Sequence, residues 1–238
     1  MTTTSPTSHS HSLLYFDGAG RAEAVRILLS IAGVAYDDVR ISYAEWNEGG
    51  KKADTPLGNV PVLTIDGVPH VQSNALARYA ARLAGWYPAR RDGGGGNDDP
   101  RHRHHDDHDV TMASLCVDEV SDCLAEVFSN APKSGDPGEL YRLRTDYQDG
   151  FLTGVARFLE GRIQGGDRTT ATAAVGFTPT FGITVADLQL YLTVQAIRSG
   201  MFDHIEMTFF DAYPGIMATF HTVQDHPAIK EYYSNAKK

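Results

Sequence analysis

The fold is decided near the start of the chain, by the stretch Leu13-Leu14-Tyr15-Phe16-Asp17-Gly18-Ala19-Gly20-Arg21. The short apolar run 13–16 predicts a strand, and the Asp-Gly-Ala-Gly sequence after it predicts a turn. From residue 21 to residue 33 apolar side chains recur at helical spacing, and Gly33 follows them as a candidate C-cap. Residues 34–41 predict a second strand. The order strand, helix, strand indicates a βαβ unit.

A hairpin and a further helix follow this unit. Residues 60–65, Val-Pro-Val-Leu-Thr-Ile, predict a strand with a proline near its start, and Asp66-Gly67 predicts a turn into a return strand at 68–71. Gln72-Ser73 opens a predicted helix that continues to Ala84. Residues 13–86 therefore predict an α/β domain of the thioredoxin-like plan, with a four-stranded mixed sheet.

The rest of the chain has a different pattern. Residues 87–109 are rich in glycine, histidine and aspartate without apolar periodicity, which predicts a linker with an insert. Residues 110–238 predict an all-α domain, in which Thr184-Val185-Ala186-Asp187 has the form of a capping box. The predicted organisation is a disordered lead (1–12), the thioredoxin-like domain (13–86), the linker (87–109) and the all-helical domain (110–238).

Composition excludes several classes of partner. The 238 residues carry a formal net charge of -9, which disfavours nucleic acid and anionic membrane surfaces. We expect no secretory signal and no transmembrane helix, because neither an apolar signal core nor a run of 18 apolar residues occurs. Cys116 and Cys123 are too far apart on one helix for a disulfide, and free thiols favour a reducing, cytoplasmic location.

Four stretches together resemble one known family. Residues 14–26 resemble the opening of sigma-class glutathione transferases, which include the glutathione-dependent prostaglandin D synthases. Residues 56–63 resemble the loop of that family into a cis-proline strand, residues 66–79 its hairpin and Gln-Ser helix start, and residues 183–188 its helical capping motif. The resemblance implies glutathione as co-substrate, a small hydrophobic electrophile as second substrate, and a homodimer. It covers nearly everything except the lead and the insert at 90–109.

Tyr15 is the candidate catalytic residue that the resemblance implies. A cysteine thiol has a pKa of roughly 8.5, so little thiolate exists near neutrality. A phenol O–H that donates to the sulfur anion lowers this pKa, and two units correspond to about 2.7 kcal/mol. Composition alone favours a packing tyrosine, whereas the Gly-Arg-Ala-Glu context favours the catalytic interpretation. Arg21 either supports the tyrosine and the thiolate or is a surface arginine at a helix start.

Two further features match glutathione contacts of the family. Gln72 and Ser73 lie where free helical N–H groups favour an anion, here the γ-glutamyl carboxylate, and Ser73 is equally a candidate N-cap. Val60-Pro61 is expected to be a cis peptide that offers the Val60 backbone to the cysteinyl residue of glutathione. An edge-strand proline is the alternative.

The contacts at the glycine end of glutathione are less determined. Trp46 and a following lysine resemble a clamp on the glycine carboxylate, but the loop is longer than in the family, so Lys51 and Lys52 are both candidates. Asn59 stands where many relatives carry lysine, and it can still form hydrogen bonds.

An acidic residue of the helical domain is the last candidate contact. Glu126 lies four residues after Asp122 on a predicted helix, and it matches a residue of relatives that reaches the glutathione amine bound by the partner subunit. The alternative is a solvated helix face, which is the more common role of two acidic residues on a helix. No metal is predicted. Ala125 interrupts the aspartate cluster that binds magnesium in some relatives. A second candidate is the group His102, His104, His105 and His108, but these residues are assigned to a flexible loop, which does not supply the fixed geometry of a metal site.

The predicted reaction is attack of the glutathione thiolate on an electrophilic carbon, in a pocket shaped partly by Met112, Cys116 and Phe220. Glutathione-dependent isomerisation and peroxide reduction are alternatives within the same chemistry. A non-catalytic binding or structural relative, such as a lens crystallin, and an interaction module are alternatives from other classes. The presence of Tyr15, Gln72 and Ser73 argues against a purely structural protein.

Overall fold

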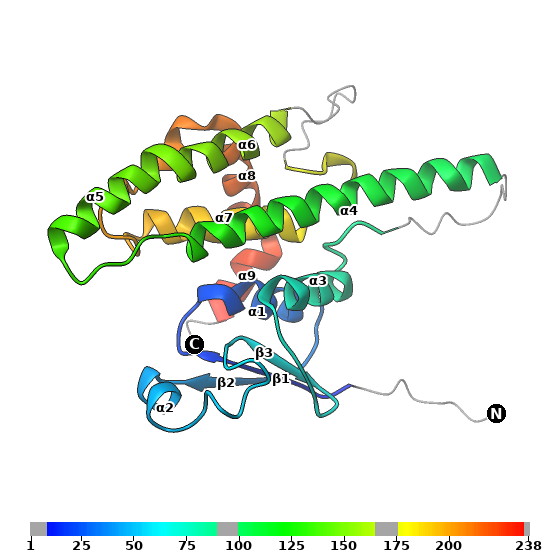
Figure 1. Cartoon of the computed structure of the whole chain (residues 1–238). Helices are drawn as coiled ribbons and strands as arrows, with labels where there is room; N and C mark the ends of the chain where they lie inside the picture. The colour runs from blue at the N-terminus through cyan, green and yellow to red at the C-terminus, as the bar shows by residue number, and fades with distance from the viewer. Residues whose placement is uncertain (1–8, 90–99, 165–175, 236–238) are drawn as a thin grey trace. The chain divides into compact units, whose positions relative to one another are not determined.

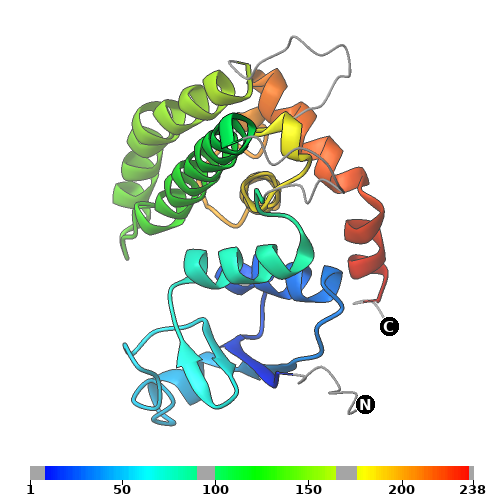
Figure 2. The same ribbon diagram turned by 90° about the vertical axis from the view of Figure 1, so that its right-hand side faces the viewer.

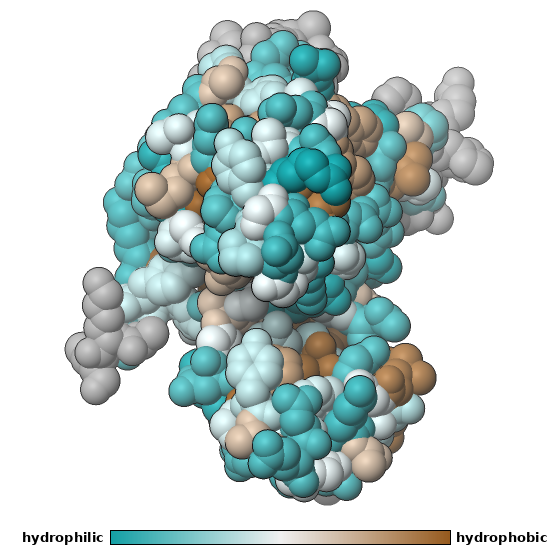
Figure 3. Space-filling view, turned by 60° about the vertical axis from the view of Figure 1, so that its left-hand side comes forward, coloured by the Kyte–Doolittle hydropathy of each residue, from teal (hydrophilic) through white to brown (hydrophobic). Residues whose placement is uncertain are grey.

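The computed structural model describes residues 9–89, 100–164 and 176–235, with side chains described for all of these except 100–106. The chain divides into two compact units, Met1–Ala84 and Gly85–Lys238. Figure 1 shows the first as a sheet with helices and the second as an array of helices. In the face drawn in Figure 3, polar side chains cover most of the surface of each unit, as expected when apolar side chains form the cores.

The first unit has the thioredoxin-like plan that the sequence predicts. Its four strands form one sheet in the order β2-β1-β3-β4, with β1 parallel to β2 and antiparallel to β3. Helices α1 and α3 pack side by side on one face of the sheet (Figure 2). The elements are β1 His11–Phe16, a 3₁₀ turn Gly20–Ala22, α1 Glu23–Ile31, β2 Asp37–Ile41, α2 Tyr43–Asn47, β3 Val62–Ile65, β4 Val68–His70 and α3 Ser73–Ala84.

Helix α1 ends as its sequence predicts. Gly33 adopts φ +65°, the left-handed conformation that a side chain disfavours. Its N–H bonds to the Ser30 carbonyl and the Val34 N–H bonds to the Leu29 carbonyl, each at 3.0 Å. These two bonds form a Schellman motif, which satisfies carbonyls left open at the helix end. Because Val34 belongs to this motif, strand β2 begins only at Asp37, three residues after its predicted start.

Strand β1 begins earlier than predicted. His11 and Ser12, assigned to the disordered lead, pair with Ile65 and Thr64 of β3. The buried imidazole of His11 also lies 2.8 Å from the Tyr79 hydroxyl. These partners are more than fifty residues away in sequence, so no local pattern predicts them. Residues 1–8 of the lead lie outside the described residues.

The second unit is helical, as predicted. Helix α7 contacts both α4 and α8, and most of its side chains are buried. The helix predicted from Tyr141 to Gln164 contains one π-helical turn. The elements are α4 Pro100–Ser129, α5 Pro137–Tyr147, the π turn Gln148–Leu152, α6 Thr153–Gln164, 3₁₀ turns Pro179–Phe181 and Phe209–Ala212, α7 Val185–Arg198, α8 Pro214–Asp225 and α9 Pro227–Asn235.

The predicted linker is wrong at its C-terminal end, because helix α4 already begins at Pro100. Proline is favoured at a first helical position, where its missing N–H is not needed. Once the packed part of a helix exists, each residue added upstream contributes a hydrogen bond without a new nucleation cost. The His/Asp-rich residues 100–109 are therefore helical in backbone. Residues 90–99 of the insert, and 165–175 of a later predicted loop, lie outside the described residues.

The capping box at the start of α7 is confirmed and is buried. The Asp187 carboxylate accepts the Thr184 N–H and hydroxyl, each at 2.8 Å, and the Phe177 N–H at 3.0 Å. Burial raises the pKa of Asp187, and these hydrogen bonds act in the opposite direction. A Cβ atom on Gly176 would lie 2.7 Å from the carboxylate, so a glycine allows this approach. The buried side chain of Asp187 thus joins helix α7 to the segment before it, which contains Phe177.

Loss of this carboxylate should destabilise the protein. We expect Asp187→Ala to lower the free energy of unfolding by about 2–4 kcal/mol, because three buried donors lose their acceptor. Asp136 is a matched control, since it caps α5 by accepting the Glu139 N–H at 2.6 Å but is exposed. Asp136→Ala should cost about 1 kcal/mol. Equal losses in urea denaturation would contradict the central role of Asp187.

Candidate functional site

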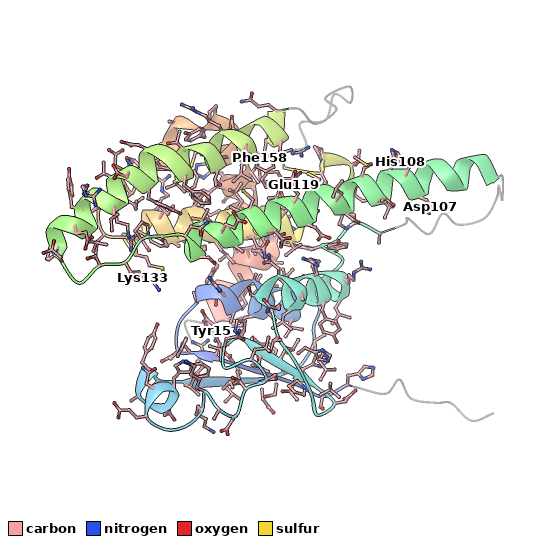
Figure 4. All side chains as sticks on the ribbon, viewed as in Figure 1. Tyr15, Asp107, His108, Glu119, Lys133 and Phe158 are labelled. Carbon is pink, nitrogen blue, oxygen red and sulfur yellow. The ribbon has the colours of Figure 1, made fainter. Side chains whose placement is uncertain are left out.

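The β1–α1 turn positions the hydroxyl of Tyr15. Tyr15 lies half-buried near the end of β1, in the first unit (Figure 4). Its hydroxyl oxygen accepts the backbone N–H of Arg21 at 3.0 Å. An oxygen that accepts one hydrogen bond is polarised to donate its own proton more strongly. The turn therefore presents a phenol O–H prepared to donate to an acceptor outside it.

Gly20 makes this arrangement possible. Its φ of +44° lies in the left-handed region. A Cβ atom on residue 20 would overlap the Tyr15 hydroxyl oxygen and lie 2.9 Å from Cε1. The backbone can therefore lie against the phenol only where residue 20 has no side chain. Gly18, in the same turn, has no atom within 4 Å of a built Cβ.

The arginine buried behind the phenol is not the one that the sequence singled out. Arg21 contacts the hydroxyl through its backbone, and its side chain is exposed. Arg26 is 0% exposed, and its guanidinium carbon lies 5.8 Å from the centroid of the Tyr15 ring. A signal for Arg26 was present in the sequence, because it falls four residues after Ala22 and three before Leu29, within the apolar stripe of α1.

Aromatic contacts bring Trp46 to the same end of β1. The Trp46 ring meets Phe16 edge-on at 5.7 Å between centroids, and Phe16 stacks on Tyr43 at 4.4 Å. Helix α2, which carries Trp46 and Tyr43, is fixed by a capping box between Ser42 and Glu45. The half-buried indole is thus held against Phe16, the residue that follows Tyr15, by the packing of its own short helix.

The start of β3 lies alongside the end of β1. Val62, the first residue of β3, pairs with Leu14, the residue before Tyr15, so Pro61 enters the sheet at the end of β1 that carries Tyr15. The Val60-Pro61 peptide is cis, which confirms that prediction. Asn59 precedes it and is exposed.

The two candidate lysines have different surroundings. Lys51 lies 3.9 Å from Asp54 in an exposed ion pair. Lys52 lies over Gly58, where a built Cβ would be 3.6 Å from Lys52 Cε. Since Gly58 leads directly into Asn59 and Val60, Lys52 is the lysine next to this segment.

Gln72 and Ser73 form the start of α3. Gln72 has φ +75°, an uncommon conformation for a residue other than glycine, and such residues cluster at functional sites. Ser73 is the first residue of the helix, and the first turn contains no acidic residue. The N–H groups and the positive end of the helix dipole at this turn suit a carboxylate ligand.

Glu126 belongs to the second unit, where it is exposed on α4. Its predicted contact with a partner subunit stays a prediction. Of the candidate pocket residues, Met112 is exposed, Phe220 is buried against Tyr191, and Cys116 is half-buried. Burial raises the pKa of the Cys116 thiol, and both cysteines are free.

The His/Asp-rich segment is only partly described. His108 is exposed on α4 (Figure 4). His102, His104 and His105 lie outside the residues with described side chains. Among the residues that were described, no group of three or more His, Cys, Asp or Glu is placed to hold a metal ion, and no helix is long and apolar enough to cross a membrane.

Comparisons with known proteins agree with the geometry of both units. Residues 11–82 match the N-terminal domain of glutathione S-transferases, and residues 149–236 match a C-terminal domain of the same proteins. A probable glutathione S-transferase of Caenorhabditis elegans is 29% identical over 228 residues, which cover 94% of this chain and 95% of the relative.

Two prostaglandin D synthases are also similar. The hematopoietic enzyme of Gallus gallus is 45% identical over 76 residues, which cover 32% of this chain and 37% of that protein. The solved structure of rat hPGDS complexed with a quinoline has a TM-score of 0.69 at 24% identity, and the match covers 95% of this chain and 96% of that one. At this identity the structural likeness shows the fold.

The β1–α1 turn should not tolerate a side chain at residue 20, where the backbone lies against the Tyr15 phenol. We expect Gly20→Ala to lower the free energy of unfolding by about 1–3 kcal/mol, because of its backbone conformation and its overlap with the phenol. Near-UV circular dichroism should change with it, since the tyrosine ring must move. Gly18→Ala, in open space, should change stability by less than about 0.5 kcal/mol. Identical unfolding curves for the two variants would refute this account of the turn.

Proposed function

This chain belongs to the glutathione S-transferase family, and on that premise we propose that its first unit binds glutathione and that Tyr15 activates the thiol. The observation that carries the proposal is the hydrogen bond from the Arg21 N–H to the Tyr15 hydroxyl oxygen, 3.0 Å long. It fixes the phenol at the end of β1 and leaves the O–H proton to be donated. The sulfur of a bound glutathione is the acceptor that we propose.

The proposed reaction follows from this donor. The phenol O–H donates to the thiolate and stabilises it relative to the thiol, whose proton goes to solvent. The sulfur lone pair then forms a C–S bond with an electrophilic carbon of a small hydrophobic substrate. In a substitution the leaving group departs with the electron pair of the broken bond.

The remaining groups of the first unit bind the rest of glutathione. Gln72 and the N–H groups at Ser73 take the γ-glutamyl carboxylate, because α3 starts there without an acid of its own. The Val60 backbone pairs with the cysteinyl residue. Trp46, Lys52 and Asn59 hold the glycine carboxylate.

The proposal extends to the assembly. We place the protein in the cytoplasm as a homodimer, in which Glu126 reaches the glutathione amine bound by the partner subunit. A detoxification role would follow from conjugation of hydrophobic electrophiles.

A second candidate activity is glutathione-dependent isomerisation. The 45% identity to the prostaglandin D synthase of Gallus gallus over 76 residues favours it. An isomerase returns glutathione unchanged, whereas a transferase consumes it. Measuring free thiol before and after turnover therefore separates the two activities. Tight glutathione binding with no turnover would instead indicate a non-catalytic binding or structural protein.

Removal of one oxygen atom tests the role of Tyr15. With an aryl halide as electrophile, we expect Tyr15→Phe to lower kcat/KM by about 10²-fold, because the donor to the thiolate is lost. Glutathione binding, measured by isothermal titration calorimetry, should persist.

The control removes an exposed hydroxyl from the second unit. Tyr141 is 59% exposed, and Tyr141→Phe should leave the rate unchanged. A Tyr15→Phe variant as active as the wild type would eliminate the phenol as thiol activator.

The two neighbouring lysines form an internal comparison. We expect Lys52→Ala to raise the dissociation constant for glutathione about 5–10-fold, as loss of one charge-assisted hydrogen bond predicts. Lys51→Ala should change it less than about twofold, because Lys51 forms an exposed ion pair with Asp54. Calorimetric titration of both variants decides the assignment, and a larger effect for Lys51 would reverse it.

A further inference from the structure

The guanidinium of Arg26 is buried at the base of the β1–α1 turn. Arg26 is 0% exposed and is among the largest fully buried side chains of the described residues. A buried cation is costly unless nearly all of its N–H groups find acceptors and its charge is compensated. Its partners therefore show what the structure uses this side chain for.

Most of those partners are backbone carbonyls of the turn. Nη1 donates to the carbonyl oxygens of Gly18, at 2.6 Å, and Ala19, at 3.5 Å. Nη2 donates to the carbonyl oxygen of Phe16 at 3.4 Å. One guanidinium thus binds three carbonyls in the four-residue segment that directly follows Tyr15.

Two carboxylates compensate the charge. Nε donates to Asp38 at 3.1 Å, and Nη1 lies 3.4 Å from Glu23. Tyr36 is also titratable and lies near this pair, and burial and the charge of Asp38 raise its pKa to about 12, so its phenol is neutral. Asp38 is held in turn by the guanidinium of Arg40, which also donates to Asp17 at 3.0 Å. The turn is therefore tied to β2 on its exposed side as well as on its buried side.

The turn held by Arg26 is the one that locates the phenol. Arg21 directly follows Gly20 at the end of this turn, and its N–H donates to the Tyr15 hydroxyl. The Arg26 guanidinium carbon lies 5.8 Å from the Tyr15 ring centroid, so its charge is also close to the phenol. Displacement of the turn would move the N–H and the ring relative to each other.

We propose that Arg26 is a positioning residue for thiol activation. It holds the β1–α1 turn so that the Arg21 N–H stays within hydrogen-bonding distance of the Tyr15 hydroxyl. This inference rests on the proposed function, because it concerns the same thiol. The role requires the planar fork of arginine, since it binds Phe16, Gly18 and Asp38 in different directions at once. A lysine keeps the charge but cannot reach all of these acceptors.

The test measures the pKa of enzyme-bound glutathione, from the ultraviolet absorbance of the thiolate, in wild type and Arg26→Lys. We expect the substitution to raise this pKa by about one unit, which lowers kcat/KM about tenfold at a pH below both values. The dissociation constant for glutathione and the far-UV circular dichroism spectrum are measured on the same samples. A folded variant that binds glutathione with an unchanged thiol pKa overturns the proposal.

The matched control is Arg144→Lys in the second unit. Arg144 donates from Nε to the Pro132 carbonyl at 2.7 Å, and its guanidinium lies over Phe202 at 5.3 Å. Its replacement should lower stability without moving the thiol pKa or the pH profile. A shift of the thiol pKa equal to that of Arg26→Lys would show that general destabilisation is sufficient, which also overturns the proposal.

A second variant covers the case in which Arg26→Lys does not fold. Asp38→Asn keeps Arg26 and removes one of the two carboxylates that pair with it, so the thiol pKa should rise in the same direction by a smaller amount. No shift in Asp38→Asn then overturns the proposal. If wild type itself does not lower the thiol pKa, the proposed function of Tyr15 fails and this inference fails with it.

Discussion

A buried guanidinium must give its N–H groups to acceptors, and in this protein that requirement shapes the segment after β1. Arg26 binds the carbonyls of Phe16, Gly18 and Ala19 and pairs with two carboxylates. The turn so formed delivers the Arg21 N–H to the Tyr15 hydroxyl, with room left by Gly20. The end of β1 then lies beside the start of β3 and beside Trp46. In this account the geometry of the candidate site depends on one buried charge, the guanidinium of Arg26.

Backbone groups supply much of this candidate site. The Arg21 N–H bonds to the Tyr15 hydroxyl, and the proposed contacts of the Val60 peptide and of the first turn of α3 would also be made by the main chain. The sequence signals that reveal them are consequently glycine, proline and serine at turns and helix starts. The second unit is built differently, around α7 and the buried Asp187.

Local patterns predicted the parts that depend on local physics. The apolar stripe of α1, its Gly33 cap, the Asp66-Gly67 hairpin and the Thr184 capping box each involve neighbours within a few residues. The pairing of His11 with β3 and Tyr79 escaped prediction because its partners are distant in sequence. The sequence alone could not separate Lys51 from Lys52, because the distinction rests on which side chain lies over Gly58 in the folded loop. Arg26 was visible as a charge within an apolar stripe, but its partners were not.

The most direct measurement is a crystal structure of the protein with glutathione bound. The account predicts the sulfur within hydrogen-bonding distance of the Tyr15 hydroxyl, with that hydroxyl still accepting the Arg21 N–H. It also predicts the γ-glutamyl carboxylate at the first turn of α3. Glutathione bound elsewhere, or bound with its sulfur turned away from the phenol, would contradict the assignment of Tyr15 as the thiol activator.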